Sequence, residues 1–208
     1  MSLEVWLLFV LVSVAPVISP GPGVLFAITN ALRFGARTTI LVGVVNAAGI
    51  AALALVVGYG LGAVMSASAI AFTALKIAGA AYLIWLGVKI WRDRSAFLVE
   101  ADATAEKPPM RKLCVHALAI SLTNPKAAVA LAALFPAFLD PTTAAGPQIV
   151  ILSLTYGGLC ALNHVVIGVA GGRIRSFLCA PNRARIIRRV AGGTFVGFGL
   201  AMAASGRP

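Results

Sequence analysis

The feature that most constrains this chain is a series of six apolar stretches, each about long enough to cross a bilayer as a helix. Their approximate limits are residues 3–31, 39–62, 69–91, 112–138, 147–170 and 186–205. A hydrocarbon core about 30 Å thick needs roughly 20 apolar residues in a helix. Hydrophobic residues make up 60% of the chain and charged residues 11%, so a water-soluble domain of this length could not bury its apolar surface. The sequence therefore predicts an all-α, polytopic membrane bundle of six transmembrane helices.

The Lys and Arg residues predict how these helices are oriented. Most of the 17 lie in three alternate connections, at 33–37, 89–112 and 173–189. Cytoplasmic loops of membrane proteins are enriched in Lys and Arg, which places these connections in the cytoplasm and both termini on the opposite side. The net charge of +11 does not predict nucleic-acid binding, because the basic residues fall in short runs between apolar stretches. The expected surrounding is a lipid bilayer.

The sequence predicts no metal site, no cofactor and no enzyme. Cys114, Cys160 and Cys179 lie within or beside apolar segments, without a CxxC spacing or an even count, and packing cysteines are the better interpretation. A membrane-embedded enzyme would need a nucleophile–base pair, metal ligands or an acidic cluster. The sequence offers two separated histidines, and the only Asp or Glu within a predicted span is Glu4, at the edge of the first.

An internal repeat divides the chain into two halves. Residues 76–85 of the third stretch align without gaps on residues 189–198 of the sixth: both begin with a basic residue, continue with Ala-Gly and carry two aromatic residues three positions apart. With three spans each, the halves cross the membrane in opposite senses, as in many alternating-access transporters. The prediction is one transporter domain with repeat 1 at about 1–91, a linker at about 92–111 and repeat 2 at about 112–208. The alternative is chance similarity between two glycine-rich apolar segments.

Two proline-containing breaks interrupt the first and fourth stretches at corresponding places. Their sequences are Ser19-Pro20-Gly21-Pro22-Gly23 and Asn124-Pro125-Lys126. Proline removes an N–H donor and glycine adds backbone freedom, so a helix ends here and a new one begins. A helix N-terminus presents N–H groups that suit a carboxylate, and a freed carbonyl needs a partner or a wet cavity at membrane depth. We expect the two breaks to face each other near mid-membrane and form a solute site; the alternative is that they are packing kinks.

A few polar side chains lie inside the apolar stretches and are further candidates. Asn30 and Asn46 join the predicted solute site, and Lys126 either pairs with a carboxylate or reaches an interface. Asn163 and His164 are the candidates for proton coupling, since histidine carries protons near neutral pH. Interhelical hydrogen bonding is the structural alternative for the same two residues.

At these residues the chain resembles the LysE/RhtB family of amino-acid exporters, especially its homoserine/threonine-type branch. The matching motifs are Ser19-Pro20-Gly21-Pro22, residues 75–87, and Leu122-Thr123-Asn124-Pro125-Lys126 with residues 131–136. The resemblance covers nearly the whole chain. It implies efflux of a small amino-acid-like solute such as homoserine, threonine or homoserine lactone across the bacterial inner membrane, driven by the proton gradient. Separately, because six helices make a small transporter, we expect that the chain can form a homodimer.

The chain departs from the family pattern at two places that bear on coupling and recognition. Many relatives carry an Asp close to the position of Asn163, and some carry a polar residue where this chain has Leu53. The rival function is a passive channel or facilitator for small solutes. Counterflow and saturation distinguish the two functions.

Overall fold

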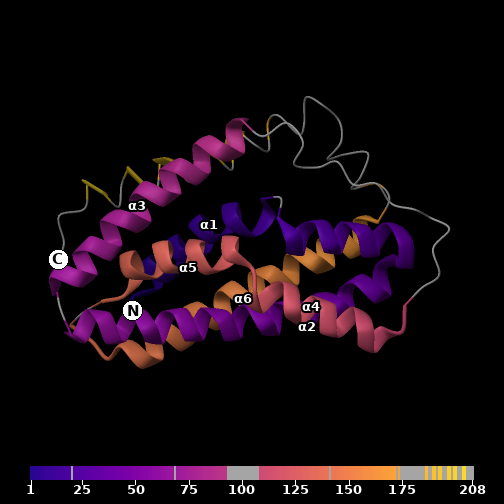
Figure 1. Ribbon diagram of the computed structural model, residues 1–208, viewed down its shortest axis with the longest axis horizontal. Helices are drawn as coiled ribbons and strands as arrows, with labels where there is room; N and C mark the ends of the chain where they lie inside the picture. Colours follow the sequence, from indigo (N-terminus) through magenta and orange to yellow (C-terminus); the bar gives the residue numbers. More distant parts are fainter. Residues whose placement is uncertain are drawn as a thin grey trace.

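The computed structural model describes residues 1–19, 21–67, 69–92, 108–140 and 142–171, together with scattered positions between 173 and 204. Within these residues the chain forms helices and no strand (Figure 1). The helices are α1 (Leu3–Ile18), α2 (Pro22–Ala67), α3 (Ala69–Arg92), α4 (Met110–Leu122), α5 (Pro125–Phe138) and α6 (Ala145–Ala170). The predicted all-α fold class is confirmed.

Both predicted breaks are present. Helix α1 ends at Ile18 because Ser19 is extended, with φ −69° and ψ 143°, and Pro22 then begins α2. The second break separates α4 from α5, which are bent by 44° relative to each other. Asn124 caps α5 and Pro125 occupies its first turn, where a missing N–H costs nothing and the fixed φ suits a helix. The first and fourth predicted stretches are therefore broken helices, as their sequences indicate.

The connection between the first two stretches is shorter than predicted. Instead of a loop between residues 31 and 39, one residue inside α2 leaves the helical conformation: Gly35 has φ 77° and ψ 178°. This left-handed region favours glycine, which has no Cβ to clash. Gly35 divides α2 into a first arm (22–34) and a second arm (36–67). Figure 1 shows the first arm running to the right-hand end and the second returning along the lower edge.

Helix α6 packs against both arms of α2 through small residues. Ile167 contacts Ala27 and Ile28 of the first arm. On the second arm, a Cβ added at Gly157 would lie 2.9 Å from the Cβ of Ala51. Membrane helices pack closely where small residues let the backbones approach. Glycine is thus required at this crossing for α6 to reach its position.

We expect Gly157→Val to destabilise the fold by about 1–3 kcal/mol, because overpacking a tight contact forces the helices apart. Gly158→Val is the matched control, since a Cβ at Gly158 meets no described atom within 4 Å. Thermal unfolding in detergent compares the two variants. Equal unfolding temperatures would show that the α2–α6 contact is not as tight as described.

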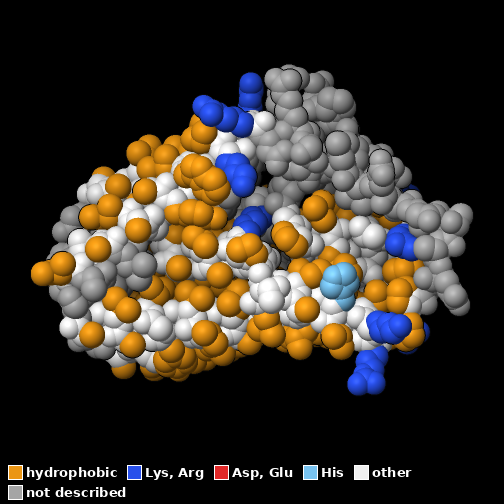
Figure 2. Space-filling view, viewed as in Figure 1, with side chains coloured by type: hydrophobic (Ala, Val, Ile, Leu, Met, Phe, Trp, Pro, Cys, Tyr) orange, Lys and Arg blue, Asp and Glu red, His pale blue; other side chains and the backbone are white. Residues whose placement is uncertain are grey.

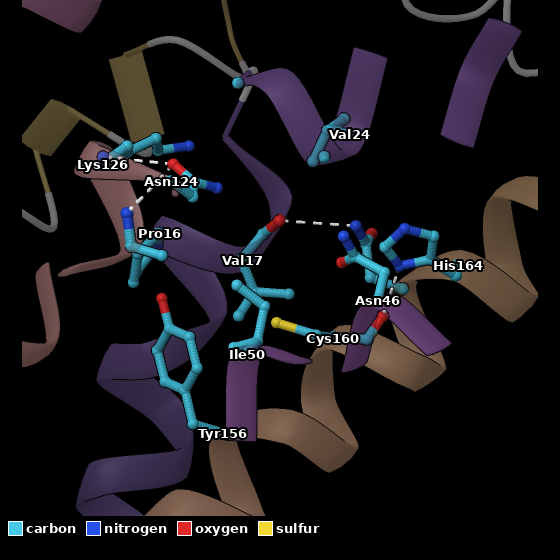
Figure 3. A pocket seen from close by; sticks show the side chains of 14 residues that line it. Pro16, Val17, Val24, Asn46, Ile50, Asn124, Lys126, Tyr156, Cys160 and His164 are labelled. Carbon is cyan, nitrogen blue, oxygen red and sulfur yellow. Dashed lines mark hydrogen bonds between the residues drawn. The ribbon is translucent and has the colours of Figure 1, made fainter. Parts of the chain in front are cut away.

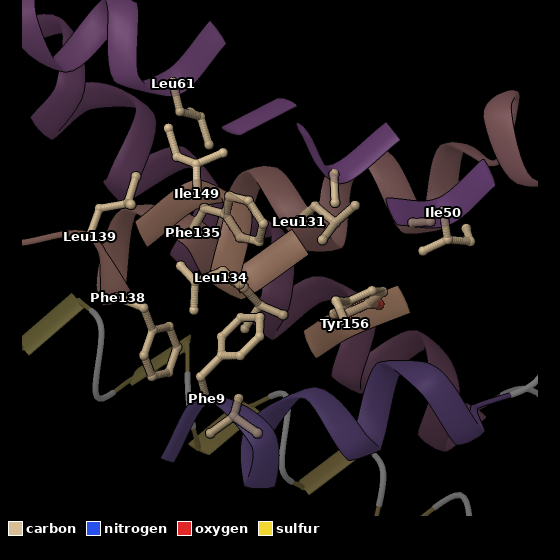
Figure 4. Close-up of a cluster of buried hydrophobic side chains, with 14 of the residues drawn as sticks. Phe9, Ile50, Leu61, Leu131, Leu134, Phe135, Phe138, Leu139, Ile149 and Tyr156 are labelled. Carbon is tan, nitrogen blue, oxygen red and sulfur yellow. The ribbon is translucent and has the colours of Figure 1, made fainter. Parts of the chain in front are cut away.

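A buried apolar cluster joins α1, α2, α5 and α6 (Figure 4). Phe9 of α1 is fully buried in the cluster, with its ring centroid 5.2 Å from that of Phe138 and 6.1 Å from that of Phe135, both in edge-on geometry. Such arrangements match the positive edge of one ring to the negative face of the other. Leu131 and Leu152 are fully buried in the same cluster. The cluster fixes α5 against α1 and α6 and so holds the two breaks in place.

The described surface is that of a membrane protein. Large apolar side chains are exposed along the helices, with exposed fractions of 68% for Leu3, 73% for Val56 and 71% for Val169. By length and composition, Pro22–Val64 and Ala145–Ala170 can cross a membrane, and α4 with α5 can form a third, bent span. Figure 2 shows hydrophobic side chains over most of this face, with Lys and Arg on its upper and right-hand parts. The molecule is a polytopic helical membrane protein.

Helix α3 lies against the described part of the sixth apolar stretch. The indole Nε1 of Trp91 donates to the carbonyl oxygen of Arg189 at 2.9 Å, and a Cβ at Gly87 would lie 2.6 Å from the carbonyl oxygen of Gly192. Most of residues 174–208 and the linker residues 93–107 lie outside the described residues. The predicted inverted repeat, which depends on residues 189–198, stays a prediction.

Candidate functional site

A pocket of about 50 Å³ lies where the two helix breaks meet (Figure 3). This is room for a small polar group or a few water molecules. Its walls come from α1, α2, α5 and α6 and from both breaks. The lining residues are Pro16, Val17, Gly21, Gly23, Val24, Asn46, Ile50, Asn124, Lys126, Ala127, Tyr156, Cys160, Asn163 and His164.

Lys126 connects the two breaks directly. Its Nζ donates to the carbonyl oxygen of Ser19 at 2.7 Å, a carbonyl freed where α1 ends. The side chain lies across Gly21, where an added Cβ would come within 3.0 Å of the lysine Cδ. A larger residue at position 21 would push the amine away. The amine thus satisfies a backbone acceptor that the membrane interior would otherwise leave without a partner.

The two helix N-termini at the pocket differ in what they present. At α5, the side-chain Oδ1 of Asn124 already accepts from the N–H groups of Lys126 and Ala127, at 3.1 and 3.2 Å. In the described conformation the Asn124 cap therefore already accepts from these two N–H groups of α5. At α2, no described residue accepts from the N–H groups of Gly23 and Val24, which line the pocket. The N-terminus of α2 is therefore the one whose N–H groups have no acceptor among the described residues, and a helix N-terminus favours negative charge.

Amide side chains form another side of the pocket. The Nδ2 of Asn163 donates to the carbonyl oxygen of Val17 at 3.4 Å, and the Nδ2 of Asn46 donates to the carbonyl oxygen of Ala117 at 3.2 Å. Each of the two amides thus donates one hydrogen bond to a backbone carbonyl oxygen. The Oδ1 of Asn46 lies beside Gly23, 3.7 Å from where a Cβ would stand. This side of the pocket is rich in hydrogen-bond acceptors.

His164 is buried on the same side with one ring nitrogen unpaired. Its Nδ1 lies 2.8 Å from the carbonyl oxygen of Cys160. A carbonyl only accepts hydrogen bonds, so Nδ1 carries the hydrogen. Nε2 is then the acceptor nitrogen of the neutral ring, and no described group is bonded to it. The Cβ of His164 lies where a side chain at Gly43 would stand, which fixes the position of the ring against α2.

The pocket contains most of the side chains predicted from the sequence. Gly21, Gly23, Asn46, Asn124, Lys126, Asn163 and His164 line it. Ser19, Pro22 and Pro125 form the breaks beside it, and Pro20 lies outside the described residues. Asn30 does not line it: the side chain is buried and its Nδ2 donates to the carbonyl oxygen of Phe26 in the same helix at 2.7 Å.

The sequence analysis missed Tyr156 and Cys160, although a signal was present. Residues 156, 160, 163 and 164 share one face of α6, because they are spaced by one and two helical turns. A face that carries Asn163 and His164 into a pocket carries these two residues as well. Among the described residues, no group of three or more His, Cys, Asp or Glu side chains could hold a metal ion.

Comparisons with known proteins agree with this arrangement. The family model described as the LysE type translocator matches residues 14–206. A membrane protein of Vibrio cholerae without an assigned function is 35% identical over 98% of both chains. The homoserine/homoserine lactone efflux protein of Salmonella typhi is 33% identical over 99% of this chain and 98% of its own length.

A more distant relative is the leucine efflux protein of Enterobacter sp. strain 638, 27% identical over 90% of this chain and 89% of its own. No solved structure matches. The pocket between two broken helices, the apolar surface and a family match over nearly the whole length point to one conclusion: the chain belongs to the LysE-type translocator family.

Proposed function

We propose that this chain exports a small amino acid or a close derivative, of the homoserine, threonine and homoserine lactone class, across the bacterial inner membrane by proton antiport and alternating access. The observation that carries the proposal is the pocket where both helix breaks meet around the Lys126 amine. The relatives named as homoserine/homoserine lactone and leucine efflux proteins support this class of solute.

The pocket has separate groups for the two charged ends of an amino acid. Lys126 and the N–H groups of Gly23 and Val24 suit the carboxylate, because an amine and a helix N-terminus both favour negative charge. The Oδ1 atoms of Asn46 and Asn163 suit the ammonium group, which only donates hydrogen bonds. This arrangement supports a zwitterion better than a simple anion or an apolar solute.

His164 is the residue we assign to proton coupling. Its acceptor nitrogen Nε2 is buried and unpaired within the described structure, so a proton can be taken up there without breaking an existing hydrogen bond. Asn163 stands beside it as a neutral residue and cannot carry the proton itself. Glu4, at the edge of the first stretch, is the only Asp or Glu within the predicted spans, and histidine is a side chain that carries protons near neutral pH.

Uptake into inside-out membrane vesicles tests the proposal. Labelled amino acids and homoserine lactone are offered with and without a proton gradient, and we expect saturable, gradient-dependent accumulation of the homoserine class. Preloading the vesicles with unlabelled solute should accelerate entry of label, which a carrier shows and a pore does not. Equilibration that ignores the gradient and shows no counterflow would establish the rival function, a passive channel. Absence of transport in vesicles with folded protein would remove the amino-acid assignment.

A further inference from the structure

Tyr156 brings to the pocket a hydroxyl group that no described residue bonds. The residue is 3% exposed and lines the pocket. Among the residues that the structure describes, none forms a hydrogen bond with its hydroxyl. The ring packs with the apolar cluster around Leu152, which fixes its direction. Figure 3 shows the hydroxyl end pointing toward Pro16, into the pocket.

A hydroxyl group at this depth without a hydrogen-bond partner is unfavourable unless a ligand supplies that partner. Moving a hydroxyl from water to an apolar environment without a hydrogen-bond partner is unfavourable. A phenylalanine would fill the same apolar site without this cost, since the ring makes all the described contacts. Buried tyrosines usually have a hydrogen-bond partner. The partner for Tyr156 is therefore to be sought in what the pocket binds.

The pocket presents three chemically different sides (Figure 3). Lys126 and Asn124 lie on one side, Asn46 and His164 on a second, and Tyr156 enters from a third. If the carboxylate of the proposed solute takes the first side and its ammonium group the second, its side chain is directed at the third. Ile50 and Cys160 line the space next to Tyr156, so the site there is narrow and apolar apart from this one hydroxyl.

We infer that the Tyr156 hydroxyl is the specificity group of the translocator, donating a hydrogen bond to an oxygen on the solute's side chain. This inference rests on the proposed function. It selects homoserine, threonine and the ring oxygen of a lactone over amino acids of equal size with apolar side chains. A site built to hydrogen-bond a solute oxygen rejects the analogue without one strongly, because the buried group is left unpaired.

The test is transport of matched pairs in the same vesicles. Homoserine is compared with 2-aminobutyrate, which lacks only the side-chain oxygen, and threonine with valine, which has a methyl group in place of the hydroxyl. In the unmodified protein we expect kcat/KM to favour the hydroxylated member by about 10-fold or more. In Tyr156→Phe the preference should fall to within about 2-fold, because hydroxylated solutes lose the hydrogen bond donated by Tyr156 while apolar solutes lose no hydrogen bond. Tyr59→Phe is the control, since Tyr59 is 52% exposed and does not line the pocket.

The outcomes separate this inference from the proposed function. The unmodified protein could transport both pairs while Tyr156→Phe leaves its preference for the hydroxylated solutes unchanged. That result would overturn the role of Tyr156 but would not contradict amino-acid export. An equal loss for both members of each pair would show a structural role for the hydroxyl and would also overturn it. If the unmodified protein moved no amino acid, the proposed function would fail, and the specificity role with it.

Discussion

Methionine in place of Lys126 should lower kcat/KM for amino-acid transport roughly 10- to 100-fold, because a charged hydrogen bond to the solute contributes about 1.5–3 kcal/mol. Methionine keeps most of the length of the side chain and removes only the amine. Homoserine lactone, which has no free carboxylate, should be affected less than homoserine. Initial rates in inside-out vesicles, normalised to folded protein, give both values.

Lys112→Met is the matched control for Lys126→Met. Lys112 is exposed at the start of α4 and does not line the pocket between the breaks, so its loss should leave transport near the unmodified rate. The role of Lys126 in carboxylate binding would be contradicted if Lys126→Met lowered kcat/KM for transport of homoserine and of its lactone by the same factor. That result would assign the amine to holding the Ser19 carbonyl only.

Asparagine in place of His164 should abolish accumulation driven by a proton gradient while leaving counterflow. Exchange of one proton per solute molecule allows about a 10-fold ratio of solute concentration inside to outside the vesicle for each unit of pH difference. In His164→Asn this concentration ratio should fall to about one. Asparagine keeps a hydrogen-bonding side chain but cannot take up a proton. Measuring the steady-state ratio and the counterflow rate in the same vesicles separates loss of coupling from loss of binding.

His116 provides the control for coupling. It is exposed on α4, beside the ring of Phe26, and it does not line the pocket between the breaks. His116→Asn should therefore keep full gradient-driven accumulation. A His164→Asn protein that still accumulated solute in proportion to the gradient would show that the proton travels by another route.

The sequence was sufficient to predict the helix breaks and their meeting, because both depend on residues with strong local effects. Two prolines flank Gly21 at the first break, and Asn124 followed by Pro125 is a strong helix-start signal at the second. Lys126 follows directly, so its position near the first break was a reasonable hypothesis. The turn at Gly35 was less evident. Whether one glycine reverses the chain or continues a helix depends on how the two arms pack, which local sequence does not specify.

The inward faces of the helices were harder to predict. In a soluble protein the polar face marks the outside, but α6 is apolar almost all round, so periodicity does not show which side meets α2. Tyr156 and Cys160 were missed for this reason, and Asn30 was placed in the site although it bonds within its own helix. Packing of small residues such as Gly157 against Ala51 decides the rotation of α6. That information appears only when both helices are in place.

If Lys126 binds the solute carboxylate as proposed, its bond to the Ser19 carbonyl is an internal competitor for the solute. A carboxylate that binds the amine replaces an existing 2.7 Å contact instead of meeting an unsatisfied charge, so the net gain is only the difference between two hydrogen bonds. Modest affinity follows, and it suits a protein that must let its cargo go on the far side. It also means that the unloaded protein can rest, and reorient, without leaving a bare charge in the middle of the bilayer.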